Sequence, residues 1–268
     1  MPIFSRQNPL VKRYRQVREG MDRRSLFLEG VRLIEDAAQS GIELESVIVV
    51  RDLLTRPHVA KLMDQLTRRG VRCEVTSWEI LTCLSDVETP QGILAIAHRR
   101  GQELEDVLGQ IEGTALIVVA EGWRDPGNLG TMLRSAEALG VHAVVTTPQT
   151  VDPFSPKVLR ASMGSALRVP IIEQVKLASA LTLFRDRGLQ IVATTARADQ
   201  ILPEVDFILS TAVLIGNEAV GLSEKALSLA TAAVRIPMRS SVESLNAAMA
   251  ATIILYEAAR QRGFDDGA

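Results

Sequence analysis

The sequence predicts an α/β protein of two domains, the second a mostly parallel sheet with helices between its strands. Its 268 residues exceed the usual size of one domain. In the second half, short apolar runs alternate with helical patterns, which is typical of buried parallel strands. A polar, glycine-punctuated segment over 98–112 separates the halves. We therefore expect a smaller α/β domain over 1–97, a linker over 98–112 and a larger domain over 113–268.

In the first half, apolar periodicity predicts helices that alternate with strands. The clearest helical stripe joins Val31, Leu33, Ile34 and Ala37. We expect helices over 9–19, 28–40, 59–69 and 78–84, and strands over 44–50, 71–75 and 92–97. These elements would form a small layered α/β domain.

The second half alternates more regularly. We expect strands over 115–120, 141–146, 190–194, 211–215 and 232–236, and helices over 129–139, 157–161 and 244–260. Parallel sheets bind their ligands outside the carboxyl ends of the strands. The loops that follow Ala120, Ile215 and Ile236 are therefore where we expect a functional site.

Composition narrows the class of protein. With 47% hydrophobic and 23% charged residues, the chain is typical of a globular protein and unlike a disordered one. No apolar stretch approaches the roughly 20 residues of a membrane span, and the N-terminus lacks the apolar run of a secretory signal peptide. We expect a cytoplasmic protein without membrane contact. Cys73 and Cys83 have no metal-ligand spacing, so we expect reduced thiols and no metal.

Basic residues gather near the N-terminus, although the net charge of the chain is only -2. The planar fork of arginine suits phosphate oxygens, so the segment over 6–24 predicts contact with an RNA backbone. A solvated helix face is an equally good interpretation. The cations concerned are Arg6, Lys12, Arg13, Arg15, Arg18, Arg23 and Arg24.

The loop after Ala120 lacks the G-x-G-x-x-G pattern of dinucleotide-binding folds. Instead, Pro126 and Gly127 predict a tight turn that presents Asn128, which could also be a simple helix N-cap. Arg134 follows at the edge of an otherwise apolar helix face, where a cation generally has an anion to meet.

Two further loops carry polar residues. After Ile215 come Gly216, Asn217 and Glu218; Glu218 could orient a substrate or simply structure its loop. After Ile236, Ser244 is expected to cap a helix that begins with Leu245 and Asn246. The alanine-rich run that follows suits an oligomer interface or a tight core equally.

Taken together, these segments resemble a known family. DPGNLGTMLRSAEALG, LIGNEAVGLS and IPMRSSVESLNAAMA resemble motifs one, two and three of the SpoU/TrmH branch of the SPOUT methyltransferases. LRASMGSALRVPI resembles a further stretch of that family, and the likeness covers 115–257. NPLVKRYRQV, FLEGVRLIEDA and TPQGILAIA are similar to segments of an N-terminal domain related to kink-turn-binding ribosomal proteins.

The resemblance implies a deep trefoil knot in the parallel sheet, an exception to the rule against threaded chains. It implies a homodimer whose active site uses both subunits, and S-adenosyl-L-methionine (SAM) as cofactor. The reaction would be methylation of a ribose 2′-hydroxyl in RNA. The extra N-terminal domain favours ribosomal RNA (rRNA) over transfer RNA (tRNA), and some relatives confer antibiotic resistance by methylating rRNA.

The resemblance also implies roles for single residues. Arg134 would activate the ribose hydroxyl, although arginine stays protonated and acts first as an electrostatic and positioning group. Asn128 and Ser244 would hold the ribose, while Glu218 and Asn246 brace the loops. The cofactor residues would be Thr194, Thr195, Ala196, Leu214, Ile215, Gly216, Asn217, Ile236, Met238, Ser244 and Leu245. Arg160 joins the expected RNA contacts, which are Arg6, Lys12, Arg13, Arg15, Arg23, Arg24 and Arg160.

Two rival functions stay open at this point. A non-catalytic RNA-binding or ribosome-assembly protein could use the same fold, but the three motifs are intact. A nicotinamide-dependent enzyme is disfavoured because the glycine fingerprint is missing. His58, His98 and His142 all lie outside the three loops, so none is expected to act as a general base.

Overall fold

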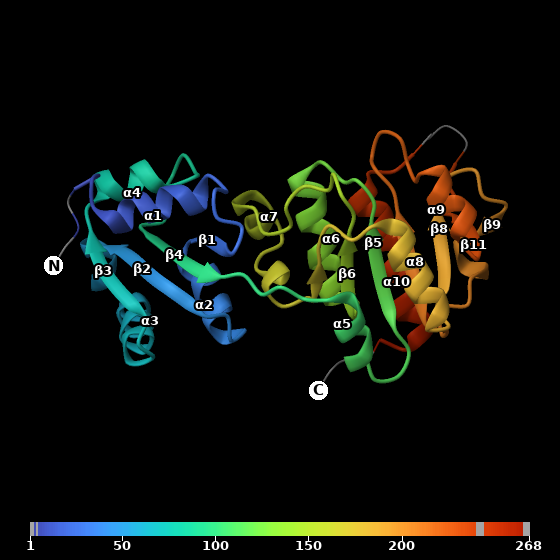
Figure 1. Ribbon diagram of the computed structural model, residues 1–268, viewed down its shortest axis with the longest axis horizontal. Coiled ribbons are helices and arrows are strands. Elements are labelled where there is room, and N and C mark those ends of the chain that lie inside the picture. Colours follow the sequence, from blue (N-terminus) through green and yellow to red (C-terminus); the bar gives the residue numbers. More distant parts are fainter. Residues whose placement is uncertain (1–2, 4, 240–243, 265–268) are drawn as a thin grey trace. The chain divides into compact units, whose positions relative to one another are not determined.

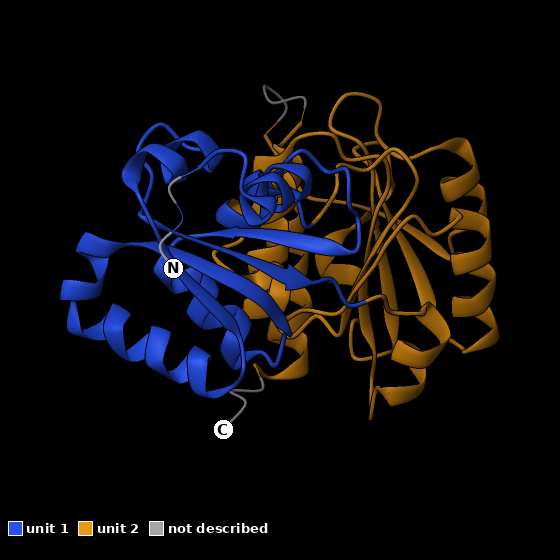
Figure 2. Ribbon diagram, turned by 60° about the vertical axis from the view of Figure 1, so that its left-hand side comes forward, with its two compact units in different colours: residues 1–100, 154–160 blue, residues 101–153, 161–268 orange. Residues whose placement is uncertain are grey.

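The computed structural model describes residues 3, 5–239 and 244–264 (Figure 1). The chain forms two compact units (Figure 2). Unit 1 contains residues 1–100 together with 154–160, and unit 2 contains residues 101–153 and 161–268. In the described ranges, no helix is long and apolar enough to cross a membrane.

Unit 1 is built on a four-stranded sheet in the order β1-β4-β2-β3 (Figure 1). Strands β2 and β3 are parallel, while β4 runs antiparallel to β1 and β2. The strands are β1 Ser25–Glu29, β2 Leu44–Val50, β3 Arg72–Thr76 and β4 Ile93–His98. The helices are α1 Pro9–Arg18, α2 Val31–Gln39, η1 Arg51–Thr55, α3 Pro57–Arg68 and α4 Trp78–Leu84.

One prediction for unit 1 was wrong at its start. The helix expected over 28–40 begins only at Val31, because residues 25–29 form β1 and Gly30 adopts φ 104°. A φ of 104° is a conformation that residues with a side chain rarely adopt, so this turn requires glycine. Every residue of β1 is buried, which removes the alternating pattern that would have indicated a strand. The other predicted helices and strands of this unit are confirmed to within two residues.

Unit 2 is built on a seven-stranded sheet in the order β7-β6-β5-β10-β8-β11-β9, and all its strand pairs are parallel. The predicted α/β fold class is thus confirmed. The strands are β5 Leu116–Ala120, β6 Ala143–Thr146, β7 Ile171–Ile172, β8 Gln190–Thr194, β9 Gln200–Ile201, β10 Thr211–Ile215 and β11 Ala232–Arg235. The helical segments are α5 Leu104–Gln110, α6 Pro126–Ala138, α7 Pro156–Ala161, η2 Ser165–Leu167, α8 Leu177–Asp186, η3 Leu202–Glu204, α9 Glu224–Leu229 and α10 Ala247–Arg262, with the first five residues of α7 in unit 1.

The segment expected to be a linker is partly structural. Helix α5 lies inside 98–112, and its Leu104, Val107 and Leu108 are buried in the core of unit 2. The three apolar positions are spaced as one helical face, but the glycines around them made the segment look irregular. The division between the units accordingly falls at Arg100, before α5.

The order of the central strands positions the site. Strands β5 and β10 are neighbours, with Ala120 opposite Ile215, so the loops that follow them leave the sheet side by side. Strand β8 follows on the other side of β10, and β11 follows β8. The carboxyl ends of four adjacent parallel strands thus form one edge, which we call the strand-end edge.

Candidate active site

A chain of side-chain hydrogen bonds joins the three loops predicted to carry the chemistry. The Nδ2 of Asn128 donates to Oε1 of Glu218 at 3.1 Å. The Oδ1 of Asn128 accepts from Nδ2 of Asn246 at 2.9 Å. Asn128 is half-buried, while Glu218 and Asn246 are exposed. Three residues separated by 90 and 118 positions in sequence therefore meet at the strand-end edge, with polar groups open to a ligand.

The local start of α6 explains why Asn128 is available. Asp125 is the N-cap, its side chain accepting from the backbone N–H of Asn128, and Pro126 occupies the first turn. The tight turn expected at Pro126 and Gly127 is therefore already helix, and Asn128 is not the cap. Because Asp125 does the capping, the amide of Asn128 can reach the other two loops.

Asn246 has a second role that the sequence had suggested for Ser244. Its Oδ1 accepts from the backbone N–H groups of Ala248 at 2.9 Å and Met249 at 3.2 Å, so Asn246 is the N-cap of α10. The prediction of Ser244 as the cap was wrong by two residues. Ser244 itself is exposed and forms no hydrogen bond with any residue in the described part of the chain. Its hydroxyl is thus open to a ligand.

The loop after β10 is held by Asn217. Its Nδ2 donates to the Gly122 carbonyl at 2.6 Å, and its Oδ1 accepts from the N–H groups of Ala219 and Val220. Its backbone pairs with Gly221 in both directions. A side chain at Gly216 would collide with the backbone of Gly221 and Leu222. These contacts fold the loop back on itself and present Glu218, while they occupy the polar groups of Asn217 that we had expected to face the cofactor.

Two residues that the sequence did not single out tie the first loop to the second. The carbonyl of Ile215 accepts from the N–H of Glu121 at 2.9 Å and from Nε1 of Trp123 at 3.0 Å. Oε2 of Glu121 accepts from the Ser223 N–H at 3.0 Å. Trp123 is fully buried. The available signal was a bulky indole in an otherwise polar loop, because a buried indole N–H needs an acceptor.

Arg134 lies on α6, six residues beyond Asn128, which corresponds to about 9 Å along the helix axis. The helix face of Leu129, Met132, Leu133 and Ala136 is fully buried, whereas Arg134 is exposed. Within the described ranges it has no hydrogen-bond or ion-pair partner. A guanidinium held on a rigid helix without an internal counter-charge is suited to bind an anionic ligand.

The segments expected to hold the cofactor follow adjacent strands. Thr194 donates its hydroxyl to the Leu214 carbonyl at 2.9 Å, and Thr195 N–H donates to the Val234 carbonyl at 2.9 Å. These bonds join the ends of β10, β8 and β11. Residues 214–216 are buried, and the apolar side chains that remain partly accessible are Ile236, Met238 and Leu245.

The histidine of unit 2, His142, does not lie at this edge. His142 precedes β6, and its Nδ1 accepts from the N–H of Leu116 at the other end of β5. Burial lowers the pKa of His142, and the charge of Arg262 lowers it further. No group of three His, Cys, Asp or Glu side chains in the described ranges could hold a metal ion.

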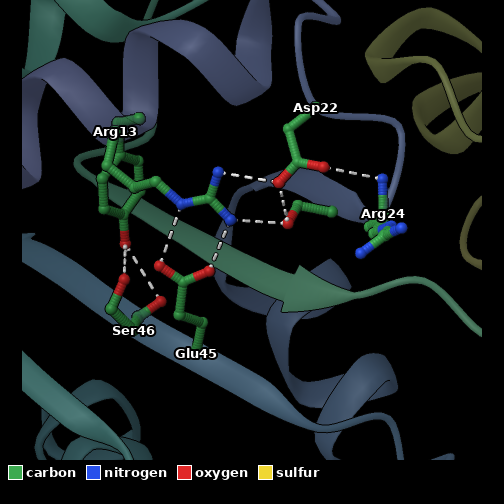
Figure 3. Close-up of polar contacts among 7 residues, drawn as sticks. Arg13, Asp22, Arg24, Glu45 and Ser46 are labelled. Atoms are coloured by element: carbon green, nitrogen blue, oxygen red, sulfur yellow. Dashed lines mark hydrogen bonds and ion pairs between the residues drawn. The ribbon is translucent and has the colours of Figure 1, made fainter.

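The arginines expected to contact RNA fall into two groups. Arg13 is enclosed by Glu45, Asp22 and Ser25 (Figure 3), which differs from the free cation that the sequence suggested. Arg6 pairs with Glu79, Arg15 donates to the Cys83 sulfur, and Arg160 pairs with Asp86. The exposed members that form no side-chain hydrogen bond or ion pair with the described residues are Lys12, Arg23 and Arg24.

Two family models match the chain. Residues 115–256 match the SpoU rRNA methylase family, and residues 8–95 match an MRM3-like substrate binding domain. Among curated proteins, the chain is 39% identical to an uncharacterized tRNA/rRNA methyltransferase, slr1673, of Synechocystis, over 97% of this chain and 94% of that protein. It is 35% identical to the 23S rRNA (guanosine-2′-O-)-methyltransferase RlmB of Bordetella pertussis, over 75% of this chain and 82% of the relative.

A solved structure gives the same result. The AdoMet-bound rRNA methyltransferase from Sinorhizobium meliloti matches with a TM-score of 0.86 and 30% sequence identity, covering 97% of both chains. The likeness therefore includes both units and the segments that form the strand-end edge.

Proposed function

Because the chain belongs to the SpoU rRNA methylase family, we propose that it is an enzyme that transfers a methyl group from SAM to a ribose 2′-hydroxyl in rRNA. The observation that carries this proposal is the contact of Asn128, Glu218 and Asn246 at the strand-end edge, with Arg134 exposed on the same helix as Asn128. This arrangement supplies amide and carboxylate groups at the strand-end edge and a guanidinium on the same helix as Asn128.

The strand-end edge fits the proposed cofactor. Ile236, Met238 and Leu245 offer apolar surface for an adenine ring, and the backbone of residues 194–196 and 214–216 follows adjacent strands. Glu218 is the charged side chain of the hydrogen-bonded set, and its negative charge suits a cationic sulfonium. When bound, SAM would supply an electrophilic methyl group.

The remaining roles belong to side chains of this protein. Arg134 would bind a substrate phosphate and lower the cost of negative charge on the attacking oxygen. Asn128 and Ser244 would hold the ribose hydroxyls, since an amide and a hydroxyl can each donate and accept. Glu218 and Asn246 would keep Asn128 oriented through the bonds already described.

The test separates catalysis from cofactor binding. We expect Arg134→Ala to lower methyl transfer at least 100-fold, because a preorganised donor at developing charge contributes that much. SAM affinity, measured by calorimetry, should stay within a few-fold. The control is Arg187→Ala, which removes another exposed arginine, at the end of α8. An equal loss of activity and SAM affinity in the Arg134 variant would contradict the role.

The choice of rRNA rests on the names of relatives and of the family model over 115–256. A tRNA substrate, or a non-catalytic role in ribosome assembly, are the alternatives. Mapping ribose methylation in rRNA and tRNA from cells with and without the gene distinguishes all three. Loss of one methyl group from rRNA supports the proposal, loss from tRNA alone shifts the substrate, and no loss supports the non-catalytic role.

We also propose a homodimer, with the trefoil knot of this family in unit 2 and a place in the cytoplasm. Met249, Ile253 and Tyr256 are 62%, 40% and 53% exposed at helical spacing on α10, which makes an apolar stripe. A second copy would cover this stripe beside the site. Light scattering should give twice the monomer mass, and Ile253→Asp should give the monomer mass with reduced methyl transfer.

A further inference from the structure

The loop over 20–24 and the end of β4 bring exposed cations together in unit 1. Ser25 and His98 are opposite each other across β1 and β4, so the residues before one lie beside the residues after the other. The N–H of Arg99 donates to the Arg24 carbonyl at 2.8 Å. Its guanidinium donates to the Arg23 carbonyl at 3.5 Å. The exposed arginines of this group, which we call the basic corner, are Arg23, Arg24 and Arg100, and the exposed side chain of His98 lies beside them.

A network centred on Arg13 shapes this corner (Figure 3). Arg13 makes a two-pronged contact with Glu45, at 3.1 and 2.8 Å, and donates to Asp22 at 2.7 Å. The other oxygen of Asp22 accepts from the N–H of Arg24 at 2.9 Å. The hydrogen bond from Arg13 lowers the pKa of Asp22 to about 2, so the carboxylate stays ionised and the loop stays anchored.

The nearby carboxylates leave the corner positive. Arg13 carries one positive charge against the two carboxylates of Asp22 and Glu45, so this trio keeps one net negative charge, while Glu19 pairs with Arg18 at 3.3 Å. Glu43 lies beside the corner, because its backbone carbonyl accepts from the N–H of His98. Its exposed side chain adds one negative charge there. Arg100 donates to the carbonyl of Gly41, which leaves its charge uncompensated. The three positive charges of Arg23, Arg24 and Arg100 therefore exceed the negative charge of Glu43 and the single net negative charge of the Arg13, Asp22 and Glu45 trio.

The arginines of α1 are less available to bind phosphate. Arg13 and Arg18 are bound to carboxylates, and Arg15 donates to the sulfur of Cys83 at 3.7 Å. Breaking such contacts to bind RNA would cancel part of the gain from a new phosphate contact. Arginines without an internal counter-charge pay no such cost.

We propose that the basic corner, rather than α1, is the surface of unit 1 that binds the phosphate backbone of the substrate RNA, and that Arg13 is the residue that positions it. This inference rests on the proposed function for its substrate class. Calorimetric binding of SAM does not depend on the corner, so failure of this inference and failure of the proposed function give different results.

The experiment compares salt dependence. Binding of a fluorescein-labelled RNA stem-loop of about 40 nucleotides is measured by anisotropy over a range of KCl concentrations. Replacing Arg23, Arg24 and Arg100 with alanine should reduce the slope of log affinity against log salt by about 2, since each lost phosphate contact removes roughly 0.7 to 0.9. The KM for RNA should rise at least tenfold, with SAM affinity within two-fold.

The matched control removes three arginines near the opposite edge of the same sheet. Arg68, Arg69 and Arg72 lie on or beside α3 and β3, and β3 is the edge strand farthest from β1. Their triple alanine variant should keep the slope within 0.5. An equal reduction in both variants, or an unchanged slope in the first, would overturn the proposal.

Adding Arg13→Ala to the corner variant tests the positioning role. If Arg13 acts only through the loop, the slope of the quadruple variant matches that of the triple variant, while Arg13→Ala alone lowers affinity at constant salt. A further reduction by roughly 0.7 would show that Arg13 itself contacts phosphate and would overturn its positioning role. Thermal unfolding of each variant checks that unit 1 remains folded.

Discussion

Gly130 is the position where a single added methyl group should disturb catalysis most directly. It lies on α6 between Asn128 and Arg134, where the helix meets the chain at Ala161 and Ser162. A Cβ at Gly130 would lie 2.5 Å from Cβ of Ala161 and 2.9 Å from the backbone nitrogen of Ser162, whereas ordinary contact begins at 3.4 Å. One of the obstacles is backbone, so either α6 or residues 161–162 must move, and a shift of α6 carries Asn128 with it.

The required movement is about 0.5 to 0.9 Å, the gap between these distances and ordinary contact. The bonds from Asn128 to Glu218 and Asn246, now 3.1 and 2.9 Å, would stretch towards or beyond their limit. A misplacement of about 1 Å costs roughly 100-fold in rate. We therefore expect Gly130→Ala to lower kcat by about 10- to 100-fold, and overpacking to cost about 1–2 kcal/mol after the gain in helix propensity.

The assay is initial-rate methyl transfer to rRNA, with thermal unfolding in parallel. The control is Gly109→Ala on α5, where a Cβ would meet nothing within 4 Å and helix propensity alone acts. That variant should keep its kcat and gain up to about 1 kcal/mol. If Gly130→Ala keeps full activity and stability while Gly109→Ala behaves as expected, the tight approach of α6 to residues 161–162 does not position the site.

Three further predictions concern stability. Because the pKa of Asp22 is lowered to about 2, the contribution of its carboxylate to folding stability is present above about pH 4 and is lost as pH falls towards 2. Asp22→Asn should therefore flatten the pH dependence of stability, measured with denaturant, over that range. The part of the pH dependence that is due to Glu257, whose pKa Arg260 also lowers to about 2, should remain. Arg262 donates to the carbonyls of Phe207, Thr114, Ala115 and Leu209, so Arg262→Ala should cost about 3 kcal/mol in urea unfolding, with partial recovery in Arg262→Lys. Trp123→Phe keeps an aromatic ring but loses the bond to Ile215 and part of the buried volume of the indole, and should cost at least about 1 kcal/mol in the same measurement.

Much of the fold could be predicted because its signals are local. Continuous apolar runs indicated β5, β8 and β10, and their parallel pairing followed from the alternation with helices. Most of the elements that were missed are short or lack a clean period; the exception is α8, a helix of 10 residues with Ala180, Leu181 and Phe184 buried. Strand β1 is buried on both faces, α5 is interrupted by glycine, and β7 and β9 have two residues each.

The convergence of Asn128, Glu218 and Asn246 could also be anticipated from the sequence, because each follows the end of a strand in one parallel sheet. The contacts that hold those residues in place could not be anticipated from the sequence. The capping of α6 by Asp125 and of α10 by Asn246 depends on which of two nearby polar residues reaches the free N–H groups. The hydrogen bonds by which Trp123 and Asn217 hold the first two loops together depend on which carbonyl faces each side chain.

Charge is the property that local sequence describes least well. Arg13 is compensated by Glu45, 32 residues away, and Arg160 by Asp86, 74 residues away, so neither partner is visible from its neighbourhood in sequence. A run of arginines therefore sets only an upper limit on the free positive charge of a surface. Folding paired two arginines of α1 with carboxylates, left Lys12 of that helix exposed, and formed the basic corner, where Arg100 comes from a strand end that the sequence had not connected with Arg23 and Arg24. A substrate RNA responds to this residual charge, and so the salt dependence of binding should follow the corner instead of the run.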